Sequence, residues 1–119
     1  MLAMLMGVKS VSCRDVNALP TSDRACVIDV NAPSRWAHAH VPGARNLDPQ
    51  HYVASDLPTD QAALLVFYCS NPMCSKAPRA ARRAMAMGHT QVRVMSAGMQ
   101  GWMEARLPVE SAPVAATAG

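Results

Sequence analysis

Residues 64–79 read LLVFYCSNPMCSKAPR, and a change of pattern inside this stretch decides the fold. The first five residues, Leu64–Tyr68, are apolar or aromatic without alternation, which predicts a strand buried on both faces. After Ser75 the apolar positions recur with helical spacing, at Ala77, Ala80, Ala81, Ala84 and Met85. The stretch therefore predicts a buried strand, a short loop and a helix, with Cys69 where the strand meets the loop.

The connecting loop is too short to do more than curl its backbone amides inward before the helix begins. Its residues are Ser70, Asn71, Pro72, Met73, Cys74 and Ser75. The first amides of a helix lack intrahelical partners and carry the positive end of the helix dipole, so they favour an anionic sulfur at Cys69. Pro78 in the first turn is compatible with this helix start. The loop therefore predicts a reactive thiol, and a purely structural buried cysteine is the alternative.

The rest of the chain alternates short strands and helices. Strands are predicted at residues 8–12, 25–30, 45–47 and 91–95, and helices at residues 14–19, 33–40, 48–53 and near Trp102. Gly88 and His89 end the helix that follows the loop. This order predicts an α/β protein with a parallel sheet and helices on both faces.

The 119 residues predict one domain at residues 1–109 and a disordered Ala/Pro/Ser/Thr tail at 110–119. Eleven basic against eight acidic residues leave a dispersed charge of +3, too small to indicate a nucleic-acid partner. No stretch approaches the ~20 apolar residues of a membrane span. The apolar start, Met1–Gly7, has no preceding basic segment and is short for a signal sequence, so we expect a cytoplasmic protein.

We expect structural or surface roles, rather than catalytic ones, for several other polar residues. Asp29 stands near the carboxyl end of a buried strand, where we expect its carboxylate to hold loop amides rather than to react. His40 is expected to fix the turn before Pro42, and His38, His51 and His89 to be surface or structural residues. Arg79, Arg82 and Arg83 lie off the apolar helix face and predict a solvated surface. Cys69 and Cys74 have no second ligand pair at zinc spacing, so no metal site is predicted.

Three blocks, in order, resemble the rhodanese-like sulfurtransferase family. Val27–Val30 with Trp36 and His40–Ala44 is similar to the first signature of the family. Val66–Cys69 is similar to its catalytic strand and nucleophile, and Gly98–Trp102 with Pro108 to its C-terminal signature. The resemblance covers roughly residues 8–109 and implies a five-stranded parallel sheet flanked by helices.

The resemblance also implies an activity. Cys69 would carry sulfane sulfur as a persulfide, taken from thiosulfate or another persulfide and passed to cyanide or a thiol. Loop amides would stabilise the persulfide anion, so no metal or organic cofactor is expected. Expected partners are these small molecules, and further candidates are a thioredoxin-like reductant and a sulfur-relay protein.

The loop Ser70–Ser75 carries no charge, whereas thiosulfate-using members of the family usually place Arg or Lys there. Arg35 and Lys76 are the candidate substrate-binding cations, with solvated surface charges as the alternative. Cys74 is either a packing residue or a resolving cysteine that forms a disulfide with Cys69. Two other functions stay open: a non-catalytic binding module, and a two-cysteine redox or arsenate-reductase-like enzyme.

Overall fold

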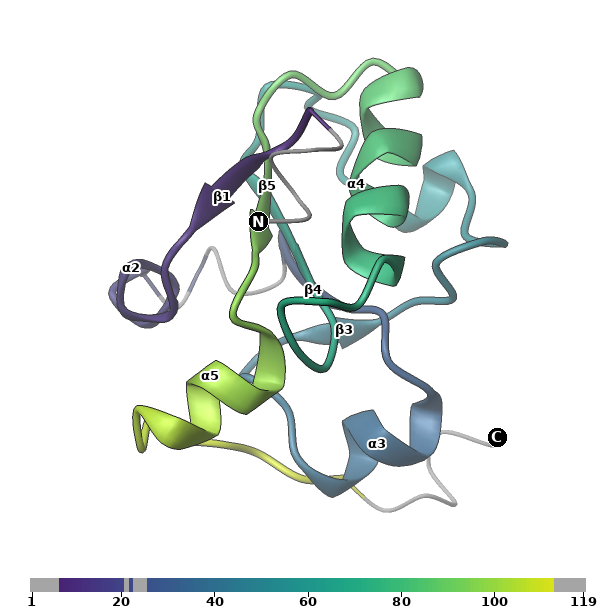
Figure 1. Ribbon diagram of the computed structural model, residues 1–119. Helices are drawn as coiled ribbons and strands as arrows, with labels where there is room; N and C mark the ends of the chain where they lie inside the picture. Colours follow the sequence, from purple (N-terminus) through teal and green to yellow (C-terminus); the bar gives the residue numbers. More distant parts are fainter. Residues whose placement is uncertain (1–6, 21, 23–25, 113–119) are drawn as a thin grey trace.

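A computed structural model describes residues 7–20, 22 and 26–112 of the chain. Within these residues, five parallel strands form one sheet in the order β1-β5-β4-β2-β3 (Figure 1). The strands are β1 (Lys9–Val11), β2 (Val27–Asp29), β3 (Arg45–Asn46), β4 (Leu65–Tyr68) and β5 (Val92–Met95). All four residues of β4 are buried, and Phe67 pairs with Ile28 on one side and Val94 on the other. The uninterrupted apolar run at Leu64–Tyr68 thus marks a central strand, and the predicted α/β class is confirmed.

Helices cover both faces of the sheet, as predicted (Figure 1). On one face α4 (Lys76–Ala86) packs through its buried small residues, Ala77, Pro78, Ala80, Ala81 and Ala84. On the other face lie α2 (Cys13–Asn17) and α5 (Gly98–Glu104), whose Trp102 is fully buried. A further helix, α3 (Pro33–His38), follows the carboxyl end of β2. No helix among the described residues is long and apolar enough to cross a membrane.

The predicted helix at residues 48–53 is wrong: this segment makes a single turn. The Asp48 carboxylate accepts the amides of Gln50 and His51 at 2.8 and 3.2 Å, which is turn chemistry that needs no helix to follow. Val53 is already extended, and the short 3-10 helix η2 (Ala54–Asp56) comes next. Tyr52 is buried and donates to the carbonyl oxygen of Ala80 at 2.6 Å, so its attachment to α4 draws the chain out of the turn.

The predicted solvated arginine face of α4 holds only in part. Arg79 and Arg82 are exposed. Arg83 instead donates from Nε and Nη2 to the Tyr52 carbonyl oxygen at 3.0 and 2.7 Å, and its guanidinium lies 5.2 Å from the centre of the Tyr52 ring. Arg83 therefore fastens the 48–53 turn to α4, a contact that helical spacing does not reveal.

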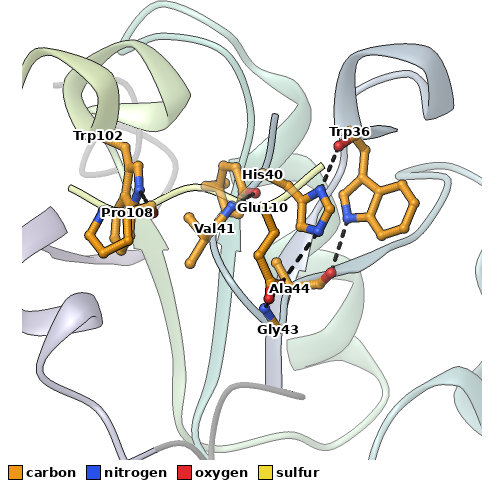
Figure 2. A network of polar contacts seen from close by, with 9 residues as sticks. Trp36, His40, Val41, Gly43, Ala44, Trp102, Pro108 and Glu110 are labelled. Carbon is orange, nitrogen blue, oxygen red and sulfur yellow. Dashed lines mark hydrogen bonds and ion pairs between the residues drawn. The ribbon is translucent and has the colours of Figure 1, made fainter. Parts of the chain in front are cut away.

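The chain beyond α5 crosses back to α3 (Figure 2). Trp102 Nε1 donates to the carbonyl oxygen of Pro108 at 2.8 Å. The backbones of Glu110 and His40 exchange two hydrogen bonds of 2.9 Å, and Glu110 Oε1 accepts the amide of Gly43 at 2.7 Å. Ala112 also donates its amide to Ala37. The folded chain thus continues three residues past the predicted boundary at 109, and residues 113–119 of the predicted tail lie outside the described residues.

His40 is buried beneath this crossing segment. Its Nδ1 lies 2.6 Å from the Trp36 carbonyl oxygen, and its ring stacks on Trp36 with centroids 4.3 Å apart. Trp36 Nε1 in turn donates to the Ala44 carbonyl oxygen at 3.0 Å, across the turn that contains Pro42 and Gly43. The predicted role of His40 at this turn agrees with its contacts.

We predict that a chain ending at Val109 is less stable than a chain ending at Ala112 by about 2 kcal/mol. The shorter chain loses four hydrogen bonds made by Glu110 and Ala112, each worth about 0.5–1.5 kcal/mol and partly exposed. Urea denaturation of both chains measures the difference. Because both lack residues 113–119, equal free energies of unfolding would contradict a stabilising role for this segment.

Candidate active site

Cys69 directly follows β4 at the carboxyl edge of the sheet, and only 3% of its surface is exposed. The loop Ser70–Ser75 then curls around one residue, Asn71. Its carbonyl oxygen accepts the Cys74 amide at 3.2 Å, and its Oδ1 accepts the Met73 amide at 2.9 Å. The strand, loop and helix-start arrangement predicted from residues 64–79 is therefore present.

The start of α5 holds the first residues of this loop in place. The amides of Met99 and Gln100 donate to the carbonyl oxygens of Cys69 and Ser70, both at 2.8 Å. Gly98 adopts φ +65°, and a Cβ there would lie 2.7 Å from backbone atoms of Cys69, Ser70 and Asn71. Only glycine permits this approach. The sequence analysis assigned Gly98 to a family signature but missed its contact with the loop.

The Cys69 sulfur faces both amides and a second thiol. Backbone N–H groups of Ala77 and Ser70 point toward it, which agrees with the predicted amide cradle. The Cys69 thiol donates to the carbonyl oxygen of Cys74 at 3.6 Å, and the Cys74 side chain is close enough to affect the pKa of Cys69. Both cysteines line a cavity of about 10 Å³, room for about one water-sized group.

The two thiols differ in pKa: that of Cys74 is lowered and that of Cys69 is raised, contrary to the expectation for Cys69. Burial, followed by the hydrogen bond with Cys74, raises the pKa of the Cys69 thiol to about 12, and the amides of Ala77 and Ser70 offset only part of this. Burial alone would also raise the pKa of Cys74. However, the hydrogen bond from Cys69, the amides of Lys76 and Ser70 and the Lys76 charge together lower it below its ordinary value. Backbone amides thus lower the pKa of both thiols, but for Cys69 the effect of burial outweighs them.

Arg35 reaches the loop from α3. Its Nη1 donates to Ser70 Oγ at 3.3 Å, and the Ser70 hydroxyl donates to Oδ1 of the buried Asn31 at 2.7 Å. These three residues line one wall of an open pocket of about 510 Å³, with His38, Asn71 and Met99 on other sides. Asn31 was not predicted as a site residue, although its place just beyond β2, at the carboxyl edge of the sheet, was the available signal.

Lys76 flanks the loop from another side. Its side chain is exposed, and its charge contributes to the lowered pKa of Cys74. It lines a second pocket, of about 380 Å³, together with Asn31, Pro33 and Asp48. The structure thus brings both candidate cations to the Cys69 loop, one over each of two pockets that share Asn31.

Asp29 supports this edge from within the sheet. It is fully buried, and its Oδ1 accepts the Asn31 amide at 2.7 Å. Burial raises the pKa of its carboxyl, against the lowering effect of hydrogen bonds from Tyr68 and Asn31. Burial and the adjacent Asp29 raise the pKa of the Tyr68 hydroxyl, so Tyr68 stays protonated. The hydrogen bond from the Asn31 amide indicates that the Asp29 carboxyl group orders the segment that follows β2.

The other cysteines lie away from the Cys69 sulfur. Cys13, whose pKa is raised by burial, is the first residue of α2 and lies in the core cluster with Trp102 of α5, on the opposite face of the sheet from α4. Cys26 directly precedes β2, and because the strands are parallel it lies at the amino edge, opposite Cys69. Among the residues described, no cluster of three His, Cys, Asp or Glu side chains could hold a metal ion.

Several solved structures share this fold. The BH2092 protein from Bacillus halodurans aligns with a TM-score of 0.76 and 19% identity, over 91% of this chain and 80% of that one. The human single-domain sulfurtransferase TSTD1 aligns with a TM-score of 0.66 and 23% identity, over 82% of this chain and 96% of that one. A Rhodopseudomonas palustris protein described as a possible tyrosine phosphatase aligns with a TM-score of 0.68 and 23% identity, over 92% of this chain and 91% of that one. At these identities the likeness shows the fold alone.

The sequence comparisons decide the family. No curated protein matches this chain by sequence. The profile of the rhodanese-like domain, however, matches residues 12–105, from the start of α2 to the end of α5. That match contains Cys69, its loop, Arg35 and Lys76. The chain therefore belongs to the rhodanese-like domain family.

Proposed function

We propose that this protein is a sulfurtransferase that carries sulfane sulfur as a persulfide on Cys69. The observation that carries the proposal is the position of the Cys69 sulfur, which follows the central strand and faces the amides of Ser70 and Ala77. Oriented N–H groups stabilise an anionic sulfur without a metal or cofactor. Membership of the rhodanese-like family supports the same activity.

The chemistry begins with a proton transfer inside the thiol pair. Cys69 gives its proton to the hydrogen-bonded Cys74 thiolate and attacks the sulfane sulfur of the donor. With thiosulfate, a bond forms between Cys69 and the sulfane sulfur, and sulfite leaves with the electron pair of the broken S–S bond. A thiol or cyanide acceptor then attacks the outer sulfur and returns Cys69 to its thiolate.

The cations flank the loop rather than belong to it. Arg35 contacts Ser70 from the 510 Å³ pocket, where it faces the sulfonate end of a bound thiosulfate in our proposal. Both Arg35 and Lys76 are exposed, so solvent weakens their hold on a dianion. We therefore expect thiosulfate to be a weaker donor than a persulfide.

The alternative functions have less support at this site. Phosphatases and arsenate reductases need a bidentate cation for a tetrahedral oxyanion, and residues 70–75 contain no arginine. A non-catalytic binding module needs no thiol at position 69, where this chain has kept one in an amide cradle. Incubation with a sulfur donor separates the classes directly, because only a sulfurtransferase gains sulfur.

We predict that the intact protein gains one sulfur atom after incubation with thiosulfate or glutathione persulfide. Cys69→Ser should lose both this gain and turnover, because it removes the sulfur that faces the Ala77 amide. Cys13→Ser and Cys26→Ser are the matched controls and should retain both. Mass spectrometry and a sulfite or thiocyanate assay give the measurements. Turnover that survives in Cys69→Ser, or no mass gain with either donor in both the original protein and Cys74→Ser, would refute the assignment.

We predict that the Michaelis constant for thiosulfate rises about tenfold in Arg35→Ala and falls by a similar factor in Met73→Arg. A charge-assisted hydrogen bond is worth about 1.5–3 kcal/mol, reduced here by exposure. Met73 is 80% exposed on the loop, so an arginine fits there without disturbing the core. Arg79→Ala, an exposed arginine of α4, serves as the control. An equal change with a persulfide donor would contradict recognition of the sulfonate.

We predict that iodoacetamide alkylates Cys74 at least about tenfold faster than Cys69 at neutral pH, because only thiolates react. A lowered pKa means deprotonation at lower pH, so Cys74 should reach half its maximal rate below the pH of an ordinary thiol. Cys69 should stay protonated until the pH approaches about 12. Peptide mapping over a pH series measures both rates, with the buried Cys13 as a slow reference. Faster alkylation of Cys69 than of Cys74 would contradict the prediction that Cys74 has the lower pKa.

A further inference from the structure

We propose that Cys74 is a resolving thiol that turns the Cys69 persulfide into hydrosulfide and a Cys69–Cys74 disulfide. An external dithiol then reopens the disulfide, so the complete cycle reduces sulfane sulfur to sulfide. The inference rests on the proposed function, because it requires sulfane sulfur on Cys69. It adds a second product and a second substrate class, the dithiol reductant.

The first observation is that the two cysteines are neighbours. The Cys69 thiol donates to the carbonyl oxygen of Cys74 at 3.6 Å, and both side chains line the same cavity of about 10 Å³ and pack against the same core cluster. Cys26 is the other half-buried cysteine of this cluster, but it lies at the opposite edge of the sheet. Proximity therefore selects Cys74 as the attacking group.

The second observation is that Cys74 is prepared as a nucleophile. Its sulfur receives the amides of Lys76 and Ser70 and lies within the field of the Lys76 ammonium. Cys69 provides a thiol hydrogen bond to it in the resting state. The thiolate is the attacking form in thiol–disulfide exchange, and a persulfide bond reacts in the same way.

The step balances without any further reagent. Cys74, which took the proton of Cys69 during loading, passes it to the outer sulfur of the persulfide anion. The Cys74 thiolate then forms a bond to the inner sulfur, on Cys69, and the bond between the inner and outer sulfurs breaks. The outer sulfur keeps the electron pair of that bond and departs with the proton as hydrosulfide. It is thereby reduced, and the two cysteine sulfurs are oxidised to a disulfide. A dithiol later returns two electrons and two protons and is itself oxidised.

The loop allows the approach that this bond requires. A disulfide bond is about 2.05 Å long, so the contact between the two thiols must shorten. The Cys69 end of the loop is held by the amides of Met99 and Gln100, whereas Pro72 and Met73 are exposed. Cys74 can therefore move toward a fixed Cys69. An external acceptor must first enter the small cavity, whereas Cys74 is already in place, which favours the intramolecular reaction.

The test is to load the full chain with glutathione persulfide, remove the donor, and withhold any acceptor. The original protein and Cys26→Ser should each release about one sulfide per loaded sulfur and lose alkylatable thiol at Cys69 and Cys74. Cys74→Ser should keep its persulfide at least about tenfold longer, because it lacks the intramolecular nucleophile. Peptide mapping without reductant should find the disulfide. In a separate assay with glutathione persulfide kept in excess, dithiothreitol should make sulfide release continuous and faster in the original protein than in Cys74→Ser.

Each outcome decides the matter. Equal sulfide release from Cys74→Ser and the original protein, or persulfide sulfur found on Cys74 itself, overturns the resolving role and leaves the proposed function standing. Failure to load Cys69 in Cys74→Ser with either glutathione persulfide or thiosulfate, together with no sulfide release from the original protein, overturns the proposed function and this inference with it. If Cys74→Ser does not fold, Cys74→Ala and the peptide map of the original protein provide the same decision.

Discussion

The contact between the start of α5 and the loop after β4 is the constraint on which the site depends. Two amides, of Met99 and Gln100, bind the carbonyl oxygens of Cys69 and Ser70, and Gly98 lets the backbones approach this closely. With those carbonyls turned toward α5, the amides of Ser70 and Ala77 are left to face the sulfur. The same contact anchors one end of the loop while its outer residues stay exposed. The two hydrogen bonds from Met99 and Gln100 thus fix Cys69 while they leave Pro72 and Met73 of the loop exposed.

The site holds its negative charge chiefly with oriented dipoles. Because residues 70–75 carry no charged side chain, a buried anion there is stabilised by backbone N–H groups, and the cations Arg35 and Lys76 act from the rim. Two neighbouring sulfurs in such a site cannot both ionise easily, and burial makes the Cys69 thiol the harder one to ionise. The more buried sulfur therefore has the raised pKa, and the more accessible sulfur has the lowered one.

The parallel topology gathers the remaining contributors at one edge. Asp29 orders Asn31 beyond β2, Asn31 accepts from Ser70 beyond β4, and Ser70 accepts from Arg35 on α3. The segment after α5 then crosses to α3 and encloses His40, which stacks on Trp36. The helix that carries Arg35 is therefore supported from its far side by residues that follow the last helix. Position at the carboxyl edge of a parallel sheet brings these distant residues together.

The sequence by itself determined the order of strands and helices, the central place of Leu64–Tyr68 and the position of Cys69, because apolar spacing and helix starts are local properties. Even the family resemblance rests on such local blocks. It did not determine the single turn at residues 48–53, where burial of Tyr52 overrides a plausible helix start. Only the tertiary structure decided which thiol has the lowered pKa, that Asn31 accepts from the Ser70 hydroxyl that Arg35 contacts, and that Glu110 belongs to the fold. Each of these depends on burial or on contacts between residues far apart in the chain, such as the 35 positions between Arg35 and Ser70, and no local pattern encodes them.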